Sequence, residues 1–289
     1  MVNLTAHTSS TSGDEPESSD GALARGRDDV PPPKAPLAPN EGKSLMVEVE
    51  GAYWARVPIR TDLFRRGDDL VDKVAAYVTK TVALMASDAS FTGAFLEPWY
   101  VVVSEKIVAI SQGRSYFTWE INPGRAARLL SKMVRRTPYG IGLGSPWTMQ
   151  LAINEAGLPR ILLAAAASVV GKMLGRRGWF YVVAGHRVNA IDGPTPYSAF
   201  PSNVSAKLPP AEPDKVAARI TQALRSQLDG DAARTLSGTV IIDSNDLGRE
   251  VLGHDSDRLP RFFCELFRDN PFGQGRQQTP IAVCVRMPS

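Results

Sequence analysis

The chain has 289 residues, of which 43% are hydrophobic, and 33 Lys and Arg against 30 Asp and Glu give it a formal net charge of +3. This length is enough for one large or two modest domains with a buried core. The basic residues are scattered and form no stripe, so the charge does not indicate a nucleic-acid-binding protein.

Cysteine usage and hydropathy predict a cytoplasmic protein that does not enter a membrane. Cys264 and Cys284 lack metal-ligand spacing, and we interpret them as buried residues in a reducing compartment. The N-terminus has no apolar segment typical of a secretory signal. The longest apolar run, Ile161–Val170, is too short to span a bilayer and instead predicts a buried helix.

The first 44 residues differ in composition from the rest of the chain. They are rich in Ser, Pro, Gly, Asp and Glu, and they carry four Lys and Arg against seven Asp and Glu. Such a segment cannot bury enough apolar surface to offset the entropy lost on ordering. We therefore expect a disordered tail at residues 1–44 and a folded domain at residues 45–289. The folded domain has a net charge of +6, which suits an anionic ligand such as a nucleotide.

Helix and strand patterns alternate along the expected domain, which predicts an α/β fold built on a mixed sheet. The predicted elements, in chain order, are a helix with the apolar stripe Leu70, Val74, Val78 and Val82; a strand at Trp99–Ser104 extended by Lys106–Ile110; an amphipathic helix at Pro123–Arg136; a helix from Ser145-Pro146 to Gly157; a buried helix at Ile161–Leu174; a strand at Trp179–Ala184; a helix with the stripe Val216, Ile220, Leu224 and Leu228; and strands at Val240–Ile242 and Pro280–Arg286 around a helix at Leu259–Arg268.

Two polar segments are the main candidates for chemistry, Val188–Lys207 and Val240–Gly253. We expect each to follow an apolar strand, because open α/β sheets place ligands at the carboxyl ends of their strands. Their carboxylate and amide oxygens suit Mg²⁺ or Mn²⁺ held together with substrate phosphates. Asp192 in the first segment precedes a turn-forming Gly-Pro-Thr-Pro run, so an Asx-type turn is the alternative interpretation there.

The segment Asp243–Asp246 places two Asp and one Asn directly after three β-branched residues. These acidic groups repel one another unless a cation or a hydrogen-bond donor lies among them. The segment therefore indicates metal or phosphate binding, and a helix cap with turn chemistry is the alternative.

Three further features leave their role open. Gly140–Gly144 precedes a helix and either cradles a phosphate or forms a structural loop, although it lacks the Lys-Ser/Thr pair of a P-loop. His186 and His254 flank the two polar segments, and we interpret them as surface or hydrogen-bonded residues. The polar segment Asp269–Gln277 either closes over a nucleotide or is an ordinary loop between a helix and a strand.

Several short motifs follow one another along the chain: Pro58-Ile59, Gly67–Leu70, Ser104–Val108, Gly113-Arg114, Asn189–Asp192, Ser202–Val204 and Leu247–Arg249. In this order they resemble the coenzyme F420:L-glutamate ligase (γ-glutamyl ligase) family, from about Trp54 to Arg286. The resemblance implies the α/β fold of that family as an intertwined homodimer. It also implies that GTP or ATP and Mg²⁺ or Mn²⁺ are used to join the amine of glutamate to a carboxylate of a deazaflavin precursor.

The metal-binding residues that the resemblance implies are only partly in register. Asp192 matches the first metal aspartate and Asn203 the nucleotide-contacting asparagine, but eleven positions separate them where the family has a short Asp-x-Ser-Asn. The intervening residues must therefore loop out. Asn245 stands in place of a metal aspartate and Asp246 in place of a metal threonine. The predicted metal ligands are Asp192 and Asp246, together with Asn245 or Asp243; Asp243 is included because it starts the same polar segment, and not because of the resemblance.

The nucleotide-binding residues are also carried over in part. Lys106 is the candidate catalytic lysine, and it also belongs to the nucleotide set. A second lysine of the family motif is absent, because this chain has Ile110 at that position. A lysine holds a phosphate as a point charge, which phosphoryl transfer requires. The remaining implied nucleotide contacts are Pro58, Ile59, Glu105, Asn203, Gly273 and Gln274.

The sequence therefore predicts a nucleotide- and metal-dependent ligase that joins a carboxylic acid to an amine through an acyl phosphate, with the acceptor acid left open. Its expected partners are a small carboxylate, an amino acid such as glutamate, and a second copy of the chain. The alternative is a nucleotide- or metabolite-binding module that keeps the fold without the chemistry, which the lost lysine and the Asp-to-Asn change favour. An oxidoreductase is disfavoured, because no flavin or nicotinamide fingerprint is found.

Overall fold

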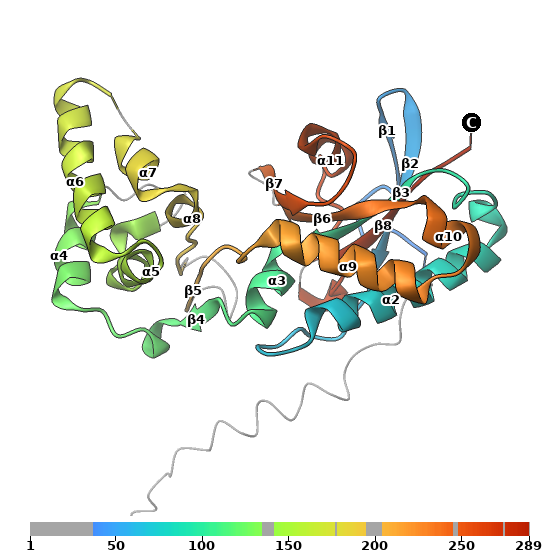
Figure 1. Cartoon of the computed structure of the whole chain (residues 1–289), viewed down its shortest axis with the longest axis horizontal. Helices are drawn as coiled ribbons and strands as arrows, with labels where there is room; N and C mark the ends of the chain where they lie inside the picture. The colour runs from blue at the N-terminus through green and yellow to red at the C-terminus, as the bar shows by residue number, and fades with distance from the viewer. Residues whose placement is uncertain are drawn as a thin grey trace, which may run out of the picture. The chain divides into compact units, whose positions relative to one another are not determined.

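The computed structural model describes residues 37–134, 142–176, 178–194, 204–244, 248–273 and 275–288. All of them belong to one compact unit, Ala35–Ser289. Its alternating helices and strands confirm the predicted α/β class with a mixed sheet (Figure 1). In the described residues no single helix is long and apolar enough to cross a membrane. The two helices Pro146–Ala156 and Leu158–Met173 reach that length and hydropathy only when they are counted together, and they are bent by 114° relative to each other.

A six-stranded sheet forms the centre of this unit, in the order β1-β2-β8-β3-β6-β7. β3 and β6 are parallel neighbours, whereas the other neighbouring pairs are antiparallel. Because β8 runs opposite to both β2 and β3, the strands β2, β3 and β6 share one direction and end at the same edge of the sheet. The strands are β1 (Met46–Val49), β2 (Ala52–Ile59), β3 (Trp99–Ser104), β6 (Leu236–Ser244), β7 (Arg249–His254) and β8 (Ile281–Arg286).

Each face of the sheet is covered by its own helices. Along β3 the side chains of Trp99, Val101 and Val103 enter one core, and those of Tyr100 and Val102 enter the other, as the period of two in a strand requires. The first core packs against α2 (Leu70–Ser87) and α9 (Pro213–Gln227), which lie side by side in Figure 1. The second packs against the phenylalanines of α11 (Pro260–Leu266).

A group of helices is inserted between α3 (Glu105–Ser111) and α9. The chain enters the group through β4 (Ser115–Phe117) and leaves it through β5 (Ser205–Lys207), and these two strands pair with each other in a separate antiparallel ribbon. The helices have a core of their own, which includes Leu143, Met149 and Ile161. They are α4 (Arg125–Met133), α5 (Pro146–Ala156), α6 (Leu158–Met173), α7 (Trp179–Ala184) and α8 (His186–Asn189).

Two predicted strands are helices. Trp179–Ala184 is α7, bounded by Gly178 and Gly185, whose φ angles of 89° and 98° favour glycine. It packs against α6 instead of joining a sheet. Lys106–Ile110 belongs to α3. The strand β3 ends at Ser104, where the N–H of Ser104 donates to the carbonyl of Pro280 at 2.8 Å, and proline has no N–H with which to continue the ladder.

The helix expected to be buried at Ile161–Leu174 is also different from the prediction. α6 buries only one face, through Ile161, Ala164 and Gly171. Its other face carries an exposed apolar stripe: Leu158, Leu162, Leu163, Val169, Val170 and Met173. The sequence could not separate these faces, because α6 is apolar on all sides.

The folded unit begins before the expected boundary at residue 44. Asn40 is buried, and its side-chain amide donates to the carbonyl of Pro271 and to Oγ1 of Thr279, both at 2.7 Å. The Nζ of Lys43 donates to the carbonyl of Asp269 at 2.6 Å. Composition did not indicate these contacts, because they are polar and not apolar.

Candidate functional site

Three of the predicted site segments meet where β2, β3 and β6 end. Ile59 at the end of β2 pairs with Ile281 of β8, which also pairs with Val103 of β3. On the other side of β3, Ser104 pairs with Ile242 of β6, one residue before Asp243. Asp243 therefore lies at the carboxyl end of β6, as predicted, but it is part of the strand and pairs with Glu250 of β7, where a loop was expected. Pro58 and Ile59 end a strand that runs in the same direction.

Glu105 and Lys106 form the first turn of α3, directly after β3. The turn exists because the ladder of β3 stops at Pro280 while Ile107 and Val108 turn into the interior. The Glu105 side chain is half-buried and Lys106 is exposed. This placement puts the candidate catalytic lysine at the same sheet edge as Asp243.

The sequence did not predict which elements position Asp192. It follows α8 rather than a strand, and it forms an isolated antiparallel bridge with Lys207 of β5. The N–H of Asp192 donates to the carbonyl of Lys207 at 3.0 Å, and the N–H of Lys207 donates to the carbonyl of Asp192 at 2.8 Å. The bridge holds Asp192 against β5, and the other strand of the ribbon, β4, follows α3 in the chain.

The electrostatics of Glu105 show that these segments converge. Burial raises the pKa of Glu105 to about 7, and the negative charges of Asp243 and Asp192 act in the same direction. The positive charges of Lys207 and Lys106 oppose this effect. Three carboxylates and two ammonium groups are thus close enough to influence one another.

Lys207 is a site residue that the sequence reasoning missed. Burial lowers its pKa, as does the charge of Lys106, whereas Asp192, Glu105 and Asp243 raise it. The sequence offered only a weak indication, because Lys207 lay at the end of an expected loop. Its strand is three residues long, too short for a periodic pattern to be recognised.

The donor set at this edge fits a divalent cation in its chemistry. Asp192 and Asp243 supply hard carboxylate oxygens. Burial is the main cause of the raised pKa of Glu105, and the negative charges of Asp243 and Asp192 add to it; a bound cation would offset these charges. Within the described ranges, no group of three or more acidic, His or Cys side chains is placed so that it could hold a metal ion. The other two predicted ligands, Asn245 and Asp246, lie outside the described residues.

The remaining nucleotide contacts are placed in part. Gly273 forms an isolated bridge with Thr279 and donates its N–H to Thr279 Oγ1 at 2.7 Å. A Cβ at this glycine would lie 2.4 Å from that of Gln277, so the loop tolerates no side chain there. The loop lies beside the ends of β2 and β3, because Thr61 N–H donates to the carbonyl of Gln278 at 2.9 Å. Asn203 and Gln274 lie outside the described residues.

The other candidates from the sequence are either packed or hydrogen-bonded within the fold or lie outside the described residues. Cys284 is buried, and burial raises the pKa of its thiol to about 12, whereas Cys264 is only half-buried, contrary to prediction. The main-chain N–H of His254 donates to Asp214 at 2.9 Å. The side chain of His186 and the first two residues of the Gly140–Gly144 loop lie outside the described part of the chain.

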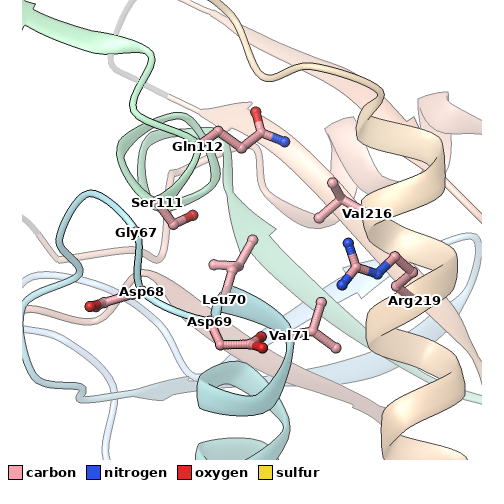
Figure 2. Close-up of a pocket in the computed structure, with 9 residues that line it drawn as sticks. All are labelled: Gly67, Asp68, Asp69, Leu70, Val71, Ser111, Gln112, Val216 and Arg219. Atoms are coloured by element: carbon pink, nitrogen blue, oxygen red, sulfur yellow. The ribbon is translucent and has the colours of Figure 1, made fainter.

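A pocket of about 330 Å³ opens at the far end of α3, where Arg219 reaches across from α9 toward the start of α2 (Figure 2). Its two acidic side chains already have structural partners. Asp68 pairs with Lys73 at 2.8 Å, and Asp69 accepts from the N–H of Asp72 at 3.2 Å. No predicted site residue lines the pocket.

Comparison with known proteins identifies one matching family. A family model described as F420-0:Gamma-glutamyl ligase matches residues 58–246, from the end of β2 to the segment after β6. No curated protein matches the chain. The matched range contains the sheet edge, the ribbon and the inserted helices.

Proposed function

Because the chain belongs to the F420-0:gamma-glutamyl ligase family, we propose that it is a nucleotide- and divalent-metal-dependent ligase that joins a small carboxylic acid to an amino acid. The observation that carries this proposal is the convergence of Asp192 and Asp243 on Glu105 and Lys106. The four residues come from three separate segments of the chain, yet their charges act on one another at one sheet edge.

The proposed reaction assigns a role to each part of the site. A carboxylate oxygen of the acid attacks the γ-phosphorus, the bond to the β-phosphate oxygen breaks, and an acyl phosphate and a nucleoside diphosphate result. The amine then attacks the acyl carbon, phosphate leaves, and the amine gives up a proton. Lys106 holds the transferred phosphate, while Glu105, Pro58, Ile59, Asn203, Gly273 and Gln274 surround the nucleotide.

The cation would be held by Asp192 and Asp243, with Asn245 and Asp246 completing the set. When bound, Mg²⁺ or Mn²⁺ neutralises charge on the phosphates during transfer. The family supports glutamate as the amine and a deazaflavin precursor as the acid, with GTP or ATP as the phosphate donor. The departures at Ile110 and Asn245 are a reason to test other acids beside that precursor.

We expect phosphate release from GTP or ATP only when Mn²⁺ or Mg²⁺, an acceptor acid and an amino acid are all present. A panel of acids and amino acids that includes glutamate is screened for released phosphate, and the amide is identified by mass spectrometry. Binding of metal and nucleotide without phosphate release for any pair would contradict the ligase proposal and support the binding module. Failure to bind nucleotide at all would contradict both.

A second copy of the chain is the proposed cover for the apolar stripe of α6. Residues 123–191 carry ten Lys and Arg and one Glu, whereas the rest of the expected folded domain, residues 45–122 and 192–289, has 19 Lys and Arg against 22 Asp and Glu. The helical group of one copy therefore complements the acidic remainder of another in charge as well as in apolar surface. This complementarity supports the intertwined homodimer that the resemblance implied.

We expect Leu163→Glu to raise the dimer dissociation constant at least tenfold, or about 1.4 kcal/mol, because it places a charge within the apolar stripe. Leu163 is 63% exposed, and the matched control Leu96→Glu alters a leucine that is 66% exposed outside the inserted helices. Sedimentation at micromolar concentration measures both variants. A monomeric wild-type protein would contradict the homodimer, and a dimeric Leu163→Glu variant would exclude α6 from its interface.

A further inference from the structure

One face of the ribbon formed by β4 and β5 is turned away from the helical core. Side chains of a strand alternate, so Ser205 and Lys207 share one face and Ala206 occupies the other. Ala206 is fully buried in the core of the inserted helices. Ser205 and Lys207 therefore lie on the opposite face, and the charges of Glu105, Lys106 and Asp243 act on the pKa of Lys207.

Asp192 and Lys207 form a cross-strand pair on this face. They exchange both main-chain hydrogen bonds, at 3.0 and 2.8 Å, so they lie directly opposite each other. Side chains of such a pair project to the same side with Cβ atoms roughly 4.5–5.5 Å apart. The backbone thus places the side chain of Lys207 on the same side of the ribbon as that of Asp192, a predicted metal ligand.

The charge of Lys207, a second lysine near Lys106, is favourable only when negative charge balances it. Lys207 is half-buried, and the positive charge of Lys106 acts against its own. The three carboxylates offset this repulsion only while no cation is bound to them. Once Asp192 and Asp243 hold a divalent cation, the two ammonium groups and the metal leave an excess of positive charge, which phosphate groups balance.

Ser205 adds an independent observation that points to a ligand. Its side chain is buried, with a residue exposure of 4%, and its Oγ has no hydrogen-bond partner among the described residues. Buried hydroxyl groups are normally hydrogen-bonded, so an unpartnered one requires an explanation. It lies on the same face as Lys207, roughly 6.6 Å along the strand, which is within the span of a di- or triphosphate.

From this arrangement we infer that Lys207 binds the phosphate groups of the nucleotide as a second lysine beside Lys106, with the Ser205 hydroxyl as an additional hydrogen-bond donor. This inference rests on the proposed function, because it requires a metal–nucleotide complex at the same sheet edge. It adds to the site two side chains, those of Lys207 and Ser205, that come from the ribbon and not from the six-stranded sheet.

The test measures binding of a non-hydrolysable GTP or ATP analogue by calorimetry at saturating Mn²⁺. Lys207→Met is expected to weaken this binding at least tenfold, and Lys207→Arg, which keeps the charge, to stay within about threefold of wild type. Lys215→Met is the matched control, because Lys215 is an exposed lysine that pairs with Glu212. Ser205→Ala is expected to weaken binding by a smaller factor, about two- to tenfold.

A purely structural role of Lys207 gives a different result. If the lysine only neutralises Asp192, its removal strengthens Mn²⁺ binding and leaves nucleotide affinity at saturating Mn²⁺ unchanged, and that outcome would overturn the inference. Failure of the wild-type protein to bind the analogue would instead overturn the proposed function.

Chemical footprinting of the wild-type protein gives a readout that does not depend on the folding of a variant. Amine acetylation followed by mass spectrometry compares the labelling of Lys207 and Lys215 with and without Mn²⁺ and the analogue. We expect the nucleotide complex to protect Lys207 at least several-fold and to leave Lys215 unchanged. Equal labelling of Lys207 in both states would contradict the inference.

Discussion

Asp192→Ala is expected to weaken metal-dependent nucleotide binding at least tenfold, which corresponds to about 1.4 kcal/mol. The substitution removes one charged oxygen ligand from a site that the proposal shares among Asp192, Asp243 and the segment after β6. It leaves the bridge to Lys207 intact, because that bridge is made by main-chain atoms. Calorimetry with Mn²⁺ and GTP or ATP measures the change, and Asp231→Ala is the control, since Asp231 pairs with Arg234 on the surface.

The companion variants Asp243→Ala and Asp246→Ala identify the second ligand. A loss in both would mean that the two aspartates share the cation or cations. A loss in Asp243→Ala alone would make Asp243 the second ligand, whose charge already acts on Glu105. If Asp192→Ala, Asp243→Ala and Asp246→Ala all bind metal and nucleotide as the wild type does, the metal lies elsewhere and the proposed site is wrong.

The sequence predicted best those elements whose pattern is local. Ser145, at the expected start of a helix, caps α5 by accepting from the N–H of Thr148 at 3.1 Å. The stripe at Val74 and Val78 is fully buried, as a spacing of four predicts. Both signals are contained within one helix, so no tertiary information is needed.

The failures occurred where a neighbouring element decides the structure. Trp179–Ala184 has the composition of a strand, but it lies between two glycines and packs against α6 without a strand to pair with. Lys106–Ile110 has the same composition, yet Pro280 ends the ladder on one side of β3 before it. β-Propensity reflects the fit to a sheet, so it misleads when the sheet provides no neighbour.

The residues of the candidate site also differ in whether a local pattern could predict their position. The place of Asp243 at a sheet edge was predictable, because it comes directly after the buried residues Val240–Ile242, although β6 continues through it to Ser244. The meeting of Asp192 with that edge was not, because it depends on a ribbon of two three-residue strands whose pairing joins residues 115–117 to residues 205–207. Lys207 was missed for this reason, since only the pairing reveals which way its side chain projects.

Asp269→Ala is expected to destabilise the fold by about 3 kcal/mol, because it leaves the Arg56 guanidinium buried without its counter-charge. The Arg56 side chain is fully buried and forms two hydrogen bonds to Asp269, one of them at 3.0 Å. The same guanidinium donates to the carbonyls of Leu266 at 2.9 Å and Ser44 at 2.6 Å. The pair therefore joins β2 to the end of α11 and to the start of the folded unit.

The contribution of this pair should depend on pH in a defined direction. Partial burial raises the pKa of Asp269, but the hydrogen bond and charge of Arg56 outweigh this effect and bring the pKa below its usual value. A lowered folded-state pKa means that the stabilisation is complete above the unfolded value of about 3.9 and is lost as the pH falls through the folded value. The difference between wild type and Asp269→Ala should thus be constant near neutral pH and shrink in acid.

Denaturant unfolding at pH 7 and at several values down to pH 3 measures both effects. Glu50→Ala is the matched control, because its pair with Arg258 is exposed on both sides and is expected to contribute at most about 1 kcal/mol. Arg56→Met should cost less than Asp269→Ala, since Asp269 is 38% exposed and can be hydrated once its partner is gone. Equal stability of Asp269→Ala and Glu50→Ala would show that the two main-chain carbonyls suffice to hold Arg56.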